Sequence, residues 1–137
     1  MSGSLPLEER MLVLLLAFLH LQQGAPQKAE TLYGALLALD PQDAEAAKGL
    51  GSARLAMGKA LEALAVLDTI VGPGEPSALV QLLRARAFAR LGQLEDARVA
   101  MRAFGALRRA ALPPDRRTPA PARSARPQPL TPVPAGS

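Results

Sequence analysis

Apolar residues between positions 50 and 67 recur every three or four residues, with polar residues between them. This spacing predicts two short amphipathic helices, because residues three and four apart lie on one face of an α-helix. Gly58 marks the turn between the two helices. The small residues Gly51 and Ala63 stand where the helices must approach most closely. The centre of the chain is therefore expected to be a helix-turn-helix unit.

This unit recurs with a period of 34 residues. Three sets of small residues share the spacing: Gly24, Gly58 and Gly92 at the turn, Ala29, Ala63 and Ala97 in the second helix, and Ala17, Gly51 and Ala85 in the first. Helix pairs of this length, with small residues at these offsets, are typical of tetratricopeptide repeats. Three copies, at 10–43, 44–77 and 78–111, are about the minimum that buries a continuous core.

Glycine and proline set the expected helix limits. Six helices are expected, at 7–23, 26–39, 43–57, 59–71, 78–91 and 94–112, with breaks near Gly24, Pro41, Gly58, positions 72–76 and Gly92. Asp43 and Ser77 are the expected N-caps of the third and fifth helices. The predicted fold class is all-α: three tandem tetratricopeptide repeats in a short right-handed solenoid. We expect a flexible arm at 1–9, the repeat domain at 10–112 and a separate tail at 113–137.

The tail contains eight prolines among 25 residues, mixed with arginine, alanine, serine and threonine. This composition cannot bury enough apolar surface to offset the entropy of the chain. We therefore expect a disordered Pro/Arg-rich tail with polyproline II character, dispensable for folding. A solubilising role and a role as ligand of a proline-binding domain both remain open.

The net positive charge lies mainly in the tail. Residues 1–112 carry 12 basic and 11 acidic side chains, although the whole chain has a net charge of +4. Arginines gather in the third repeat, at Arg84, Arg86, Arg90, Arg98, Arg102, Arg108 and Arg109. They favour either an acidic partner or a solvated helix face with Glu95 and Asp96 as local partners. RNA binding would need interleaved aromatic residues, and aromatics make up 3% of the chain, so no nucleic acid is expected.

The apolar run at 11–19 is too short to span a bilayer, which takes about 20 residues. It follows Glu8 and Glu9, where a signal peptide requires net positive charge. We expect a cytosolic protein without direct membrane insertion.

Nothing in the sequence favours catalysis, and no cofactor or metal is expected. There is no cysteine. His20, the only histidine, stands at a packing position of the repeat, so a structural role is expected. The stretch from Gly51 to Lys59 resembles a phosphate-binding loop, but its glycines are too far apart and Ala60 stands where Ser or Thr would bind magnesium. A protein-binding module is the expected class.

The first helix is apolar on every side, which exceeds what packing in a repeat array requires. In tetratricopeptide arrays the first helix of each pair lines the concave face. At helical spacing this face is expected to consist of Leu14, Phe18, Leu21, Lys48, Ser52, Leu55, Leu79, Leu82, Arg86 and Ala89. Its ligand is expected to be an apolar or amphipathic segment, helical or extended.

Three segments resemble the small tetratricopeptide chaperones of bacterial type III secretion. They are Leu-Val-Leu-Leu-Leu-Ala-Phe-Leu-His-Leu-Gln-Gln-Gly at 12–24, Ala-Leu-Leu-Ala-Leu-Asp-Pro at 35–41 and Leu-Gly-Gln-Leu-Glu-Asp-Ala-Arg at 91–98. The chain is most similar to the YscY-type chaperones, and the likeness covers about residues 10–110.

The resemblance implies a cytosolic bacterial chaperone that keeps a small secreted X-type partner soluble as a heterodimer. It also implies delivery of that partner to the export gate. Because the apolar first helix is exposed, such a chaperone is expected to aggregate or self-associate when the partner is absent. Two alternatives stay open: a translocator chaperone, which keeps pore-forming proteins soluble, and a scaffold that joins two folded proteins.

Overall fold

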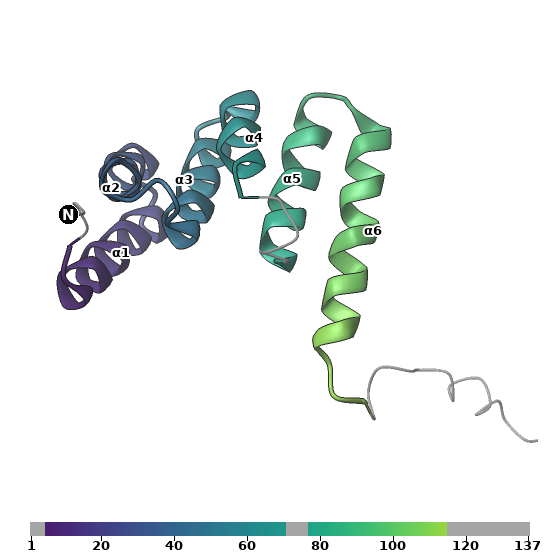
Figure 1. Ribbon diagram of the computed structural model, residues 1–137. Helices are drawn as coiled ribbons and strands as arrows, with labels where there is room; N and C mark the ends of the chain where they lie inside the picture. The colour runs from purple at the N-terminus through teal and green to yellow at the C-terminus, as the bar shows by residue number, and fades with distance from the viewer. Residues whose placement is uncertain (1–4, 71–76, 115–137) are drawn as a thin grey trace, which may run out of the picture. The chain divides into compact units, whose positions relative to one another are not determined.

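The computed structural model of the chain describes residues 5–70 and 77–114. Within these ranges it contains α-helices and no strand: α1 (Leu7–Gln22), α2 (Pro26–Leu39), α3 (Ala44–Ala56), α4 (Ala60–Asp68), α5 (Ala78–Arg90) and α6 (Leu94–Ala111) (Figure 1). The all-α prediction is confirmed. Helix limits fall within three residues of those expected, the largest difference being the end of α4. The expected break at 72–76 and most of the tail lie outside the described residues.

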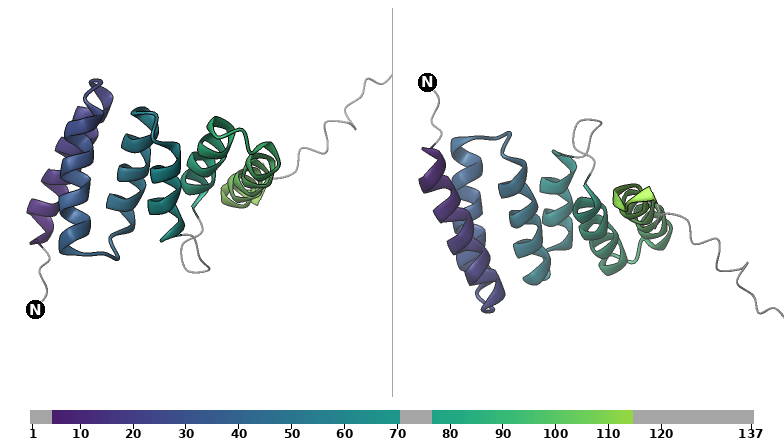
Figure 2. Two further views of the ribbon diagram at one scale, coloured as in Figure 1. Left: turned by 90° about the horizontal axis from the view of Figure 1, so that it is seen from above. Right: turned by 90° about the horizontal axis from the view of Figure 1, so that it is seen from below.

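The chain forms two compact units, Met1–Leu107 and Arg108–Ser137. In the first unit, helices that follow one another in the chain pack side by side from α1 to α5, and the first helices of successive pairs also meet (Figure 2). α5 and α6 are not among the closely packed pairs. The described part of the second unit, residues 108–114, holds the end of α6 and the turn after it. Because α1 begins at Leu7, positions 7–9 of the expected arm lie in a helix.

The same turn joins the two helices of each repeat. Its glycine has a φ of 78–80° at Gly24, Gly58 and Gly92, a left-handed conformation that other residues rarely adopt. The residue after each glycine donates a backbone hydrogen bond to a carbonyl five positions earlier: Ala25 to His20 (2.8 Å), Lys59 to Arg54 (2.8 Å) and Gln93 to Phe88 (2.9 Å). This bond is the 6→1 bond of a Schellman motif, so glycine is needed to end each first helix and reverse the chain.

Small residues allow the helices to approach closely at the centre of the array. Ala17, Ala29 and Ala63 are fully buried. A Cβ atom added to Gly51 of α3 would lie 2.8 Å from Cδ2 of the fully buried Leu67 in α4. A Cβ atom on Gly49 would lie 2.2 Å from the ring of Tyr33 in α2. α3 is therefore held between its two neighbours at glycines, where no side chain could fit without displacing others.

Asp43 joins the first repeat to the second. Its Oδ1 accepts a hydrogen bond from the backbone N–H of Ala46 (3.1 Å), which caps α3 as expected. The guanidinium of Arg10 in α1 donates from Nη2 to Oδ1 (2.7 Å) and from Nε to Oδ2 (2.9 Å). Arg10 is the main reason that the pKa of Asp43 lies below its ordinary value; the opposing effect of burial is smaller.

We expect Asp43→Asn to lower the free energy of unfolding at neutral pH by about 2 kcal/mol, because the charge-assisted bonds to Arg10 are lost. The folded-state pKa of Asp43 is lowered, so its contribution is fully present above the unfolded-state value of about 3.9 and is lost as pH falls through the folded-state value. Urea unfolding of both proteins from neutral to strongly acidic pH tests this. The difference between them should shrink on acidification, and a constant difference would contradict the assignment.

A candidate binding groove on the first helices

An open groove of about 550 Å³ lies along the first helices of the repeats. Most of its residues belong to α1 and α3, with one from α2 and one from α5. They are Met11, Leu14, Leu15, Phe18, Leu21, Gln22, Tyr33, Glu45, Lys48, Gly49, Ser52 and Leu79.

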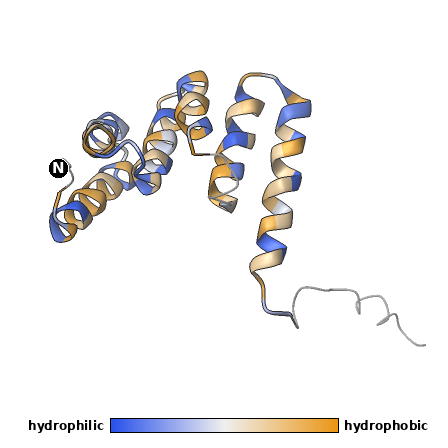
Figure 3. Ribbon diagram, in the orientation of Figure 1, coloured by the Kyte–Doolittle hydropathy of each residue, from blue (hydrophilic) through white to orange (hydrophobic). Residues whose placement is uncertain are grey.

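The α1 side of the groove is apolar and exposed. Phe18 has 48% of its surface accessible, and Met11 and Leu15 are slightly more exposed. Figure 3 shows α1 as a largely hydrophobic helix, whereas α3 alternates between the two kinds of residue. Folding leaves this apolar surface in water, and a contiguous exposed apolar patch marks an interaction site or a tendency to aggregate.

Tyr33 and α3 form the remaining sides. Tyr33 is buried, with its ring over Gly49, and this burial together with the charge of Glu45 raises the pKa of its phenol. Glu45 and Lys48 form an ion pair (3.3 Å) on the α3 side. The groove thus combines an apolar side with a charged one, as the surface that receives an amphipathic segment does.

Six of the ten residues expected on the concave face line this groove: Leu14, Phe18, Leu21, Lys48, Ser52 and Leu79. The placement of Leu55 was wrong. It is only 4% exposed and belongs to the buried core. Leu82 is partly buried and does not line the groove. Arg86 and Ala89 line a different groove, between α5 and α6.

Sequence reasoning missed Tyr33, Met11, Leu15, Gln22, Glu45 and Gly49. The apolar run of α1 contained a signal for Met11 and Leu15. Tyr33 lies in a second helix, and a rule restricted to first helices could not include it. The sequence signal for Tyr33 was Gly49, since a residue without a side chain leaves room for a neighbouring ring.

The arginines of the third repeat have different surroundings. Arg84 forms an ion pair with Asp68 of α4, and its guanidinium lies 5.2 Å from the ring centre of Phe88. Its counter-charge therefore comes from within the chain, so no acidic partner is needed to explain Arg84. Arg98 pairs with Glu95 (2.6 Å), one of the expected local partners.

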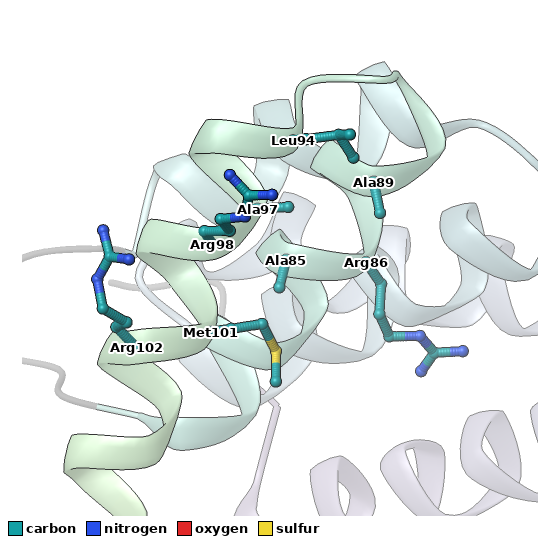
Figure 4. A pocket seen from close by; sticks show the side chains of 8 residues that line it. All are labelled: Ala85, Arg86, Ala89, Leu94, Ala97, Arg98, Met101 and Arg102. Atoms are coloured by element: carbon teal, nitrogen blue, oxygen red, sulfur yellow. The ribbon is translucent and has the colours of Figure 1, made fainter.

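A second groove, of about 500 Å³, lies between α5 and α6 (Figure 4). It is lined by small and apolar residues and by three arginines: Ala85, Ala89, Leu94, Ala97 and Met101, with Arg86, Arg98 and Arg102. No described helix is long and apolar enough to cross a membrane. Nowhere in the described ranges do three or more His, Asp or Glu side chains gather closely enough to hold a metal ion.

In a comparison of the sequence with models of protein families, the model of the tetratricopeptide repeat matches residues 20–87. Together with the helix pairs and their recurring turn, this match defines the fold as an array of tetratricopeptide repeats, and the predicted fold class is confirmed. No curated protein sequence matches the chain.

Among solved structures, the chain is similar to PcrH, crystallised in complex with the chaperone-binding region of PopB. The TM-score is 0.70 and the sequences are 25% identical. The match covers 91% of this chain and 98% of the PcrH chain. The similarity therefore extends beyond a single repeat to almost the full length of a protein that holds a segment of another.

Proposed function

We propose that this protein is a chaperone of bacterial type III secretion, which binds an apolar or amphipathic segment of a secreted protein in the groove lined by α1 and α3. The observation that carries the proposal is the near full-length similarity to PcrH, a protein solved with the chaperone-binding region of its partner. The exposed apolar side of the groove is independent support, because folding alone does not account for it.

Within this class, a translocator chaperone is better supported than the YscY-type chaperone favoured by the sequence resemblance. The similarity to PcrH supports the translocator chaperone, since the match covers 91% of this chain. The client would then be a pore-forming secreted protein rather than a small X-type partner. The role is one of binding, without catalysis or cofactor, in the bacterial cytoplasm. We also propose that the chaperone delivers its client to an export-gate component.

The physical basis of client binding is the removal of apolar surface from water, both in the groove and on the client segment. A client segment with large apolar side chains on one face would cover Phe18 and its neighbours, and each buried methylene group contributes about 0.8 kcal/mol. Polar residues on its opposite edge would face the Glu45–Lys48 pair. Such a segment aggregates when exposed, so its burial keeps the client soluble until export.

Coexpression tests the proposal. Each secreted protein of the host's type III system is expressed alone and together with this chain, and its soluble fraction is measured. We expect a pore-forming protein to become soluble only with the chain and to copurify with it in a defined ratio. Rescue of a small X-type protein alone would restore the YscY-type assignment. A chain that rescues none but joins two folded proteins would be a scaffold.

A further inference from the structure

The two ends of the repeat array have complementary unpartnered surfaces. One is an outer face of α1, formed by Leu12, Leu16 and Leu19, which is distinct from the binding groove. The other is the groove between α5 and α6. The 34-residue register shows what each surface would contact in a longer array.

The outer face of α1 corresponds to surfaces that are buried in the other repeats. Leu12 is 63% exposed and Leu16 45%, and Leu19 is similar. The residues 34 positions later in α3 are all buried: Ala46, Leu50 and Ala53. In α5 the equivalent positions are Val80 and Ala87, which are buried, and Arg84, which binds Asp68.

Two contacts show which way this face points. Arg84 of α5, the equivalent of Leu16, binds Asp68 in α4. Gly49 of α3, which directly precedes the equivalent residue Leu50, meets the ring of Tyr33 in α2. In both cases the first helix of a repeat contacts the second helix of the repeat before it. The leucines on α1 therefore occupy positions that face a preceding repeat, and the described chain has no helix there.

The α5–α6 groove is the opposite case. Met101 lies 34 positions after Leu67 and 68 positions after Tyr33, which are both buried. Met101 itself is 45% exposed and lines the groove. Likewise Leu55 is buried and its equivalent, Ala89, is exposed. The groove is thus the surface on which the first helix of a following repeat would pack.

We propose that α1 of one copy packs into the α5–α6 groove of a second copy, so that the repeat register continues from one molecule to the next. α1 is itself a first helix, and its outer face carries the three exposed leucines Leu12, Leu16 and Leu19. The sequence from 113 to 137 does not repeat the 34-residue pattern of small and apolar positions, and it contains eight prolines among 25 residues. A second copy therefore suits the groove better than the chain's own tail.

Charge favours the same pairing. Within the described residues, Arg86 and Arg102 form no ion pair, and neither do Glu8 and Glu9 at the start of α1. The acidic end of α1 is attracted to the basic surroundings of the groove, whereas the basic tail is repelled. The contact is head-to-tail and does not close on itself, so assemblies should grow with concentration.

The test uses the purified full chain without client, so its outcome does not depend on the proposed function. Sedimentation velocity over a wide range of concentrations should show a mass that rises beyond the monomer. Leu12→Glu, on the α1 face, and Met101→Glu, in the groove, should each weaken association about tenfold or more. The matched controls Leu61→Glu and Val99→Glu replace exposed residues of α4 and α6 that line neither groove, and should have no such effect.

Mixing the two variants gives the decisive result. Leu12→Glu retains an intact groove and Met101→Glu an intact α1 face, so together they should form one interface and a 1:1 dimer. If Met101→Glu alone still associates as the unaltered chain does, the contact is between two α1 helices and the proposal is overturned. A monomer at every concentration, or equal loss with Val99→Glu, would also overturn it. Circular dichroism checks folding, and Leu12→Ser and Met101→Ser replace any glutamate variant that loses helix.

Discussion

Replacing Gly51 with leucine is expected to lower the free energy of unfolding by about 3 kcal/mol, a large share of what a domain of this size has. A Cβ atom at position 51 lies 2.8 Å from Cδ2 and 2.9 Å from Cγ of Leu67. Leu67 is fully buried, so it has no free space into which to move. Urea unfolding followed by circular dichroism measures the change.

Gly34 provides the matched control. It lies inside α2, and a Cβ atom there would meet no other atom within 4 Å. Gly34→Leu makes the same chemical change in a helix without a clash, and replacing a helical glycine stabilises by about 0.5–1 kcal/mol. The two substitutions should therefore have opposite signs. Equal effects would mean that α3 and α4 do not cross at Gly51.

Phe18→Ala is expected to weaken client binding about 30-fold, equivalent to a loss of about 2 kcal/mol, without changing helix content. Phe18 is the aromatic residue of the groove on α1, and its side chain is half exposed before a client binds. An aromatic side chain buried at the centre of an interface typically contributes this much. Titration of the purified client against each variant measures the loss.

Leu61→Ala serves as control, because it also removes an exposed apolar side chain but from outside both grooves. Its affinity should equal that of the unaltered chain. Arg98→Ala, in the α5–α6 groove, should also have little effect. If Arg98→Ala weakens binding and Phe18→Ala does not, the client uses the basic end of the array and a scaffold role becomes the better explanation.

The helices and their turns could be predicted because they depend on local chemistry. A left-handed residue is needed after each first helix, and glycine provides it at Gly24, Gly58 and Gly92. The N-caps Asp43 and Ser77 likewise act on the backbone N–H groups three residues away. The end of α4 was less well predicted, because apolar residues continue to Val71 and give no signal where the helix ends.

The groove could be predicted only in part, because exposure depends on which repeat follows. Leu21 and Leu55 occupy the same position of their repeats, yet the first lines the groove and the second is buried in the core. The equivalent position in the third repeat, Ala89, is exposed beside α6. Periodicity identifies a face of a helix but not its neighbours, which differ at the two ends of a short array.

The contact between Arg10 and Asp43 also could not be predicted from the sequence pattern. The acid was expected to cap α3, and its cap bond is present. Its arginine partner lies 33 residues earlier and was not expected, since nothing in local sequence links a residue at the start of α1 to the start of α3. Long-range polar pairs of this kind depend on how the helices are packed.

The position of Tyr33 has a spectroscopic consequence. The chain contains one tyrosine and no tryptophan, so its intrinsic fluorescence comes from a single ring at the contact between α2 and α3. Circular dichroism instead averages over every helix, including α6, which lacks close packing against α5. Poorly packed segments open at low free energy, and in a repeat array they can do so without the remainder. On heating, ellipticity should therefore begin to fall while the tyrosine emission still reports an intact centre.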